Sequence, residues 1–131
     1  AFYFIRNNVF RQVGGFDEDY FVYLEDLDLS LRINKLGYRS FYNANIKAYH
    51  KGGGTSERVK AKRLFYSLES RIKYSKKHFP PISSSLVIVS TLAVEPFIRM
   101  GENIFLGSKE NLLNTLKAYK MLYKHLLTKK S

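Results

Sequence analysis

The sequence predicts an α/β domain followed by a helical extension. Over residues 1–80, short apolar and aromatic runs alternate with segments of helical periodicity, as in a mixed fold. The chain then changes character at Pro80 and Pro81, beyond which only helical patterns follow. With 131 residues the chain has the length of one domain. We therefore expect a domain portion at 1–80 and an amphipathic helical extension at 81–131.

Three strands and two helices are expected in the first 50 residues. The predicted strands are residues 2–5, 41–42 and 46–50, which are apolar or alternate between two faces. Residues 9–13 predict a short helix that Gly14 and Gly15 end. Residues 24–36 predict a longer helix, because apolar residues recur there at helical spacing and Gly37 is suited to its C-terminal cap.

The remaining residues predict a helix, an uncharged stretch and a last helix. Residues 52–54 are glycines that form a hinge, and Thr55 and Ser56 suit the N-cap of a helix that runs to about Lys77. Residues 82–94 carry no charge, but these 13 residues are fewer than the roughly 20 of a spanning helix, so we expect a core or interfacial segment. The last helix, capped by Ser108, has an apolar stripe and a cationic row. The stripe is Leu112, Leu116, Tyr119, Leu122 and Leu126, and the row is Lys117, Lys120 and Lys124.

The net charge of +11 is unevenly distributed. Residues 1–50 hold six basic and six acidic side chains, so the whole excess lies beyond them. A basic second half favours an anionic partner: a nucleic acid, a membrane surface or a phosphorylated ligand. The absence of Cys excludes disulfides and thiolate metal sites and fits a reducing compartment.

Six acids gather in two groups in the neutral first part of the chain. Asp17, Glu18 and Asp19 are in a turn, and Glu25, Asp26 and Asp28 are at a helix start. Carboxylates at a helix start are stabilised by its free N–H groups and dipole, which is a structural explanation for the second group. Crowded acids otherwise repel one another unless a cation or a proton offsets them. The pattern thus also suits a metal site or a site of proton transfer.

The order of these residues resembles family-two glycosyltransferases, especially the bacterial rhamnosyltransferase-like members. The matching sequence letters are GGFDE at 14–18, the aromatic run at 20–23, ED at 25–26, DL at 28–29, Arg32, GY at 37–38, and His50 before the glycines. The resemblance covers about residues 1–80. It implies a nucleotide-diphospho-sugar transferase domain of GT-A type, of which this chain is the C-terminal, acceptor-side half. We therefore expect a piece of a longer protein, inactive alone, whose metal-binding Asp-x-Asp motif lies upstream.

The same resemblance implies roles for particular residues. Asp26 is expected to be the catalytic base. The negative charge of Glu25 is expected to raise the proton affinity of Asp26, whereas the helix end lowers that affinity. The expected substrate-binding residues are Gly15, Phe16, Asp17, Gly53, Gly54 and Ser56, and the expected metal ligand is His50. Structural interpretations stay open: an ordinary turn at 14–18, a plain hinge at 52–54, a structural histidine, and Asp26 with Asp28 as the metal motif itself.

The implied function is inverting transfer of a sugar from a nucleotide-diphospho-sugar to a saccharide or lipid-linked acceptor, in cell-surface polysaccharide synthesis. The implied cofactor is Mg²⁺ or Mn²⁺, held mainly by residues upstream of this chain. We expect a cytoplasmic protein that is peripheral on the inner face of the cell membrane, attracted to anionic lipid, with no nucleic-acid partner. The rival functions are a basic nucleic-acid-binding module, suggested by Lys, Arg and aromatic residues at 60–77, and a noncatalytic membrane-interaction module.

Overall fold

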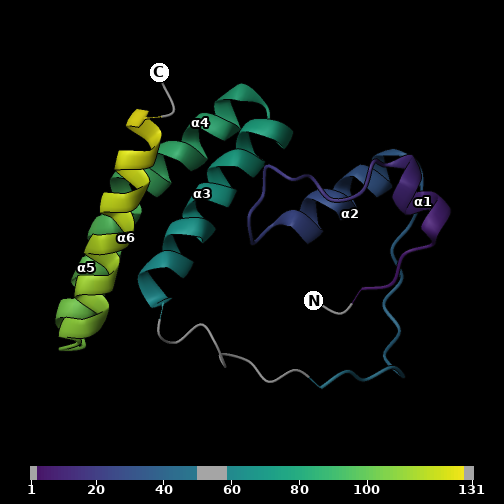
Figure 1. The fold of residues 1–131 in the computed structure, drawn as a ribbon. Coiled ribbons are helices and arrows are strands. Elements are labelled where there is room, and N and C mark those ends of the chain that lie inside the picture. Colours follow the sequence, from purple (N-terminus) through teal and green to yellow (C-terminus); the bar gives the residue numbers. More distant parts are fainter. Residues whose placement is uncertain (1–2, 50–58, 129–131) are drawn as a thin grey trace. The chain divides into compact units, whose positions relative to one another are not determined.

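The computed structural model describes residues 3–49 and 59–128, which form helices and connecting segments. The elements are α1 (Asn7–Gln12), α2 (Glu25–Lys35), α3 (Lys60–His78), α4 (Pro81–Val89), the π-helical turn η2 (Ser90–Val94), α5 (Glu95–Phe105) and α6 (Lys109–Thr128) (Figure 1). The chain divides into two compact units, Ala1–Gly54 and Thr55–Ser131. The functional boundary predicted at residue 80 stays a prediction.

The α/β fold class, and with it a GT-A-like domain, is wrong for this structure. In the described parts of the chain no residue forms a strand, and the segments predicted as strands at 2–5, 41–42 and 46–50 are extended or turned where the structure describes them. A strand needs a neighbour for its backbone N–H and C=O groups. Apolar composition marked these segments, but none of the described residues supplies a partner strand.

The first unit is built around the contact between α1 and α2. Val9, Leu29 and Ile33 form its buried core, with Ile5, Phe10 and Val13 packed around them. Helix α1 begins two residues earlier than predicted, at Asn7. At the end of α2, Gly37 has a φ of +87° and donates its N–H to the Asn34 carbonyl oxygen at 2.9 Å. Its predicted role as the C-terminal cap is confirmed.

The second unit is a helical bundle in which α6 packs along both α3 and α5, and α3 also contacts α4 (Figure 1). The core consists of Phe65, Leu68 and Ile72 from α3 and Ala118, Tyr119 and Leu122 from α6. The predicted stripe of α6 is therefore only partly right. Tyr119 and Leu122 are buried, but Leu116 is 47% exposed and Ala118 takes an inner position.

Helices α4 and α5 are joined by η2 into one continuous helix of 25 residues, Pro81–Phe105. Pro96 has no N–H to donate to the Leu92 carbonyl oxygen four residues earlier, and this oxygen instead accepts the Tyr123 hydroxyl at 2.6 Å. By length and composition the helix is long enough to cross a membrane, which the 13 uncharged residues alone did not suggest.

Candidate functional site

The first turn of α2 brings Glu25, Asp26 and Asp28 together at the helix N-terminus, as the sequence predicts. The two residues before it, Tyr23 and Leu24, have φ values of 68° and 65°. Left-handed backbone costs a non-glycine residue about 1 to 2 kcal/mol. Such strain is concentrated at functional sites, where it holds particular side chains in place. The backbone of Tyr23 and Leu24, which leads into these three acids, is therefore strained.

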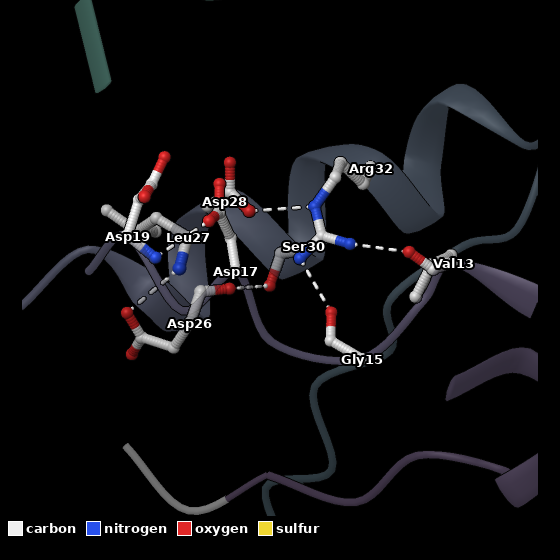
Figure 2. Close-up of polar contacts among 9 residues, drawn as sticks. All are labelled: Val13, Gly15, Asp17, Asp19, Asp26, Leu27, Asp28, Ser30 and Arg32. Atoms are coloured by element: carbon white, nitrogen blue, oxygen red, sulfur yellow. Dashed lines mark hydrogen bonds and ion pairs between the residues drawn. The ribbon is translucent and has the colours of Figure 1, made fainter. Parts of the chain in front are cut away.

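Asp26 has one carboxylate oxygen engaged and one available. Its Oδ1 accepts the backbone N–H of Leu27 at 2.8 Å, and its backbone carbonyl accepts the Ser30 hydroxyl at 2.7 Å (Figure 2). Among the described residues, Oδ2 has no hydrogen-bond partner. The side chain is partly exposed, so a hydroxyl group can approach it. A carboxylate fixed through one oxygen and open at the other has the geometry of a general base.

Glu25 lies beside Asp26 in the sequence but is less accessible. Its Oε2 is buried and has no hydrogen-bond partner among the described residues. A buried carboxylate oxygen without a donor is unfavourable, because it has lost water and gained nothing in exchange.

Asp28 has a different environment from the other two acids. Its side chain is fully buried, and its Oδ2 forms an ion pair with Arg32 Nε at 2.7 Å. A carboxylate paired in this way is occupied by the guanidinium group, which disfavours Asp26 and Asp28 as a metal motif. Among residues 3–49 and 59–128, no group of three His, Cys, Asp or Glu side chains is arranged to hold a metal ion.

Arg32 joins α2 to the turn that precedes it. Besides Asp28, it donates to the carbonyl oxygens of Val13 and Gly15, both at 2.7 Å (Figure 2). The planar guanidinium group suits three acceptors at fixed angles, which a lysine cannot match. The Asp28–Arg32 spacing of four residues on a helix was the sequence signal for the ion pair, but the carbonyl contacts had none.

The turn at Gly14–Asp19 presents the predicted substrate-binding residues. Gly15 has a φ of +74°, and a Cβ there would lie 3.3 Å from the Phe10 ring, so this position requires glycine. Phe16 is half exposed and packs edge-on against Phe10, with ring centroids 5.7 Å apart. Asp17 Oδ1 accepts the backbone N–H of Asp19 at 2.9 Å, which stabilises the turn (Figure 2).

Four predicted site residues, His50, Gly53, Gly54 and Ser56, lie outside the described residues. The structure therefore brings together Gly15, Phe16 and Asp17 in one turn and Glu25 and Asp26 in the next element, with Arg32 linking the two segments. The left-handed Tyr23 and Leu24 had no signal in the sequence.

A groove of about 850 Å³ in the first unit does not include these acids. It is lined mainly by the extended segments at 3–6 and 38–43, with Val9 and Ile33 from the helices. Its walls include residues of all three segments that were predicted as strands. The acids in the first turn of α2, Glu25, Asp26 and Asp28, are here called the acidic turn. The groove and the acidic turn are therefore separate features of this unit.

The rival nucleic-acid interface is disfavoured by the packing of α3. None of the three aromatic side chains that would stack on bases is fully exposed: Phe65 is buried, while Tyr66 and Tyr74 are half-buried. Tyr74 packs on His78, with ring centroids 4.7 Å apart. Base stacking requires an open aromatic face. The lysines of α3 thus lack the aromatic partners that this function would need.

Comparison with known proteins gives partial matches to rhamnosyltransferases. The chain is 42% identical over 60 residues to an N-acetylglucosaminyl-diphospho-decaprenol L-rhamnosyltransferase found in two strains of Mycobacterium tuberculosis, which covers 46% of this chain and 20% of that protein. It is 33% identical over 91 residues to the rhamnosyltransferase WbbL of Escherichia coli K12, covering 64% of this chain and 34% of that protein. The chain thus spans between a fifth and about a third of these relatives. No family model and no solved structure matches.

Proposed function

We propose that this chain belongs to a glycosyltransferase that transfers a sugar, with inversion, from a nucleotide-diphospho-sugar to a saccharide or lipid-linked acceptor in cell-surface polysaccharide synthesis. The observation that carries the proposal is Asp26, held through Oδ1 and open at Oδ2, in a chain similar to rhamnosyltransferases. The names of those relatives favour L-rhamnose as the sugar and a polyprenyl-diphosphate-linked saccharide as the acceptor.

In the proposed reaction the acceptor hydroxyl gives its proton to Asp26. Its oxygen attacks the anomeric carbon, and the bond from that carbon to the diphosphate oxygen breaks on the opposite face. The electron pair of the broken bond leaves with the nucleoside diphosphate. Asp26 is suited to this step because a positioned base within reach of the hydroxyl lowers the barrier to attack.

The neighbouring residues have supporting roles in this proposal. Glu25 lies next to Asp26 in the first turn of α2 and adds negative charge beside it. Gly15, Phe16 and Asp17 form the substrate-facing turn, in which the half-exposed Phe16 ring offers an apolar surface to a sugar. Arg32 and Asp28 hold this turn against α2.

The proposal also includes a divalent cation, Mg²⁺ or Mn²⁺, and the binding of the diphosphate by Gly53, Gly54 and Ser56. The described residues do not fit a metal site by themselves. His50 remains the proposed ligand from this chain, with the other ligands outside it, and no step above depends on the cation.

For localisation we propose the cytoplasmic face of the cell membrane.

Replacement of Asp26 by Asn in the full-length protein tests the proposed base. Asn keeps the size of the side chain and can accept the Leu27 N–H, but it cannot take a proton. Turnover is expected to fall by about 10² to 10⁴, the usual contribution of a general base. The measurement is the transfer rate with a panel of nucleotide-diphospho-sugars that includes L-rhamnose donors.

Glu18→Gln is the matched control, since it removes an exposed acid from the preceding turn and should leave turnover nearly unchanged. An Asp26→Asn enzyme with parental turnover would exclude Asp26 as the base. Absence of any transfer by the parent protein across the panel would instead count against the proposed function itself.

A further inference from the structure

The continuous helix Pro81–Phe105 directs several of its polar side chains inward. Ser84 and Thr91 are buried against the rest of the second unit. Glu95 forms ion pairs with Arg71 of α3 and with Arg99, and Asn103 Nδ2 donates to Thr115 Oγ1 of α6 at 3.1 Å. The inner side of this helix is therefore held by polar contacts to both neighbouring helices.

The outer side of the same helix is apolar and exposed. Seven large apolar residues are each more than half exposed: Ile82, Leu86, Val89, Phe97, Ile98, Ile104 and Phe105. Ile82, Leu86 and Val89 are spaced by four and three residues, and the other four follow as the adjacent pairs Phe97 with Ile98 and Ile104 with Phe105. Together these seven exposed residues are here called the outer apolar face. Only 17% of the apolar stretch is buried within the structure.

Ile88 and Leu92 of this helix pack against the core of the second unit. A helix on a water-soluble bundle would bury most of its large apolar residues and expose its polar side, whereas this helix leaves seven large apolar residues exposed. The polar contacts of Glu95 and Asn103 fix the orientation, so rotating the helix would leave buried groups without partners. A contiguous exposed apolar surface of this kind marks an interaction site. The outer apolar face is therefore built to be covered.

We propose that the outer apolar face docks onto an anionic lipid surface, with the helix lying in the plane of the interface. Residues 59–128 contain twelve Lys or Arg and four Glu, a net charge of +8. Anionic headgroups attract this charge, and the outer apolar face enters the acyl boundary below them. A second copy of the chain would instead bring two strongly positive surfaces together.

The neighbouring helices favour docking in the plane over spanning. Helix α6 packs along α5 and carries Lys117, Lys120 and Lys124 exposed. If Pro81–Phe105 crossed the bilayer as part of this bundle, these lysines would enter the hydrocarbon, where cations are strongly disfavoured. In the plane of the interface the same lysines can reach headgroups or water.

The test is sedimentation of the 131-residue chain with vesicles of phosphatidylcholine, with and without about a quarter of phosphatidylglycerol. The docking variant combines Leu86→Ser, Phe97→Ser and Phe105→Ser. The matched control combines Phe4→Ser, Phe41→Ser and Tyr42→Ser, three residues of the first unit that are also mostly exposed. Helix content and thermal midpoint should match the parent in both, because none of these side chains is buried.

We expect the parent and the control to bind anionic vesicles, more weakly as salt is raised. The docking variant should bind at least about tenfold more weakly. If the docking variant loses structure, Phe105→Ser alone should still reduce vesicle binding measurably, because Phe105 is 91% exposed.

Equal binding of the docking variant and the parent would overturn the proposal. So would a parent dimer in sedimentation equilibrium that the docking variant abolishes, since the occupant would then be a second copy. Resistance of vesicle-bound chain to alkaline carbonate extraction would overturn the in-plane orientation and indicate spanning. The proposed docking to lipid does not depend on sugar transfer. If the test of one proposal fails, the other proposal is unaffected.

Discussion

Asp26 and Asp28 are two positions apart in the same helical turn, yet their surroundings differ. Asp26 is partly exposed, and one of its carboxylate oxygens has no hydrogen-bond partner among residues 3–49 and 59–128, whereas Asp28 is fully buried and paired with Arg32. The sequence shows only two similar acids at a helix start, where both would be stabilised alike. Solvent access and pairing distinguish a chemical role from a structural one, and neither is encoded in spacing alone.

Replacement of Asp28 by Asn should destabilise the first unit. The variant keeps the shape but removes the charge that balances the part-buried guanidinium group of Arg32. A hydrogen bond to a charged group contributes about 1.5 to 3 kcal/mol, so a loss of this order is expected. This is larger than the effect of a helix-end acid alone, which is about 0.3 to 1 kcal/mol.

Chemical denaturation monitored by circular dichroism measures this loss. Glu18→Gln is the control, because it neutralises an exposed acid in the same region. Equal stability of Asp28→Asn and the parent would show that the Arg32 contacts to the Val13 and Gly15 carbonyls suffice to hold the turn.

At the scale of the element, η2 depends on both Pro96 and Tyr123. The Leu92 carbonyl oxygen receives the Tyr123 hydroxyl at 2.6 Å where Pro96 has no N–H to offer. Tyr123→Phe should therefore destabilise the second unit by about 0.5 to 1.5 kcal/mol, the net value of one hydrogen bond. Thermal or denaturant unfolding of the variant measures this.

A double-mutant cycle with Pro96→Ala isolates the contact. Alanine restores a backbone N–H that can bond the Leu92 carbonyl oxygen, so Tyr123→Phe should cost less in that background. The same cost in both backgrounds would mean that the hydroxyl stabilises the helix independently of the proline.

Tyr119 of α6 gives the second unit a dependence on alkaline pH. Burial, reinforced by the negative charge of Glu95, raises the pKa of Tyr119 from 10.0 to about 12. Above pH 10.0 the unfolded chain ionises this tyrosine first, so stability is fully present below that pH and is lost as pH rises toward about 12. The loss is at most about 1.4 kcal/mol per pH unit.

Tyr119→Phe should flatten this part of the stability profile. At neutral pH it should be close to neutral or stabilising, because the Tyr119 hydroxyl is buried without a hydrogen-bond partner among the described residues. Tyr42→Phe, at a residue 94% exposed, is the control and should keep the parental profile. A Tyr119→Phe profile as steep as the parental one would assign the alkaline loss to other groups.

The elements differ in how well the sequence predicted them. The α2 helix, its acids and Gly37 followed from local signals, which depend on neighbours a few residues away. The segments at 41–42 and 46–50 failed as strands, because strand formation depends on a distant partner. The helix Pro81–Phe105 was underestimated because Pro96, Glu95 and Arg99 suggest an end. In the structure the helix continues through a π-helical turn, and Glu95 is paired with Arg71 of α3.

At the scale of the whole molecule, the two units carry different parts of the proposed function. The acidic turn lies in the first unit, and the outer apolar face lies in the second. Variants of one unit should then leave the property of the other unchanged. The docking variant Leu86→Ser, Phe97→Ser and Phe105→Ser should weaken vesicle binding without altering the stability effect of Asp28→Asn.

The 131-residue chain alone should show neither sugar transfer nor appreciable affinity for a nucleoside diphosphate. It spans between a fifth and about a third of the rhamnosyltransferases it resembles, and the part that the structure describes has no three-ligand group for the metal that would bind a diphosphate. A diphosphate held without its cation loses the strongest charge in such a site. Calorimetry of the chain with nucleoside diphosphates and Mn²⁺ measures this, and the full-length protein is the positive control. Tight binding by the chain alone, abolished by Asp26→Asn, would show that the acidic turn binds the cation and would replace the base assigned to Asp26 with a metal ligand.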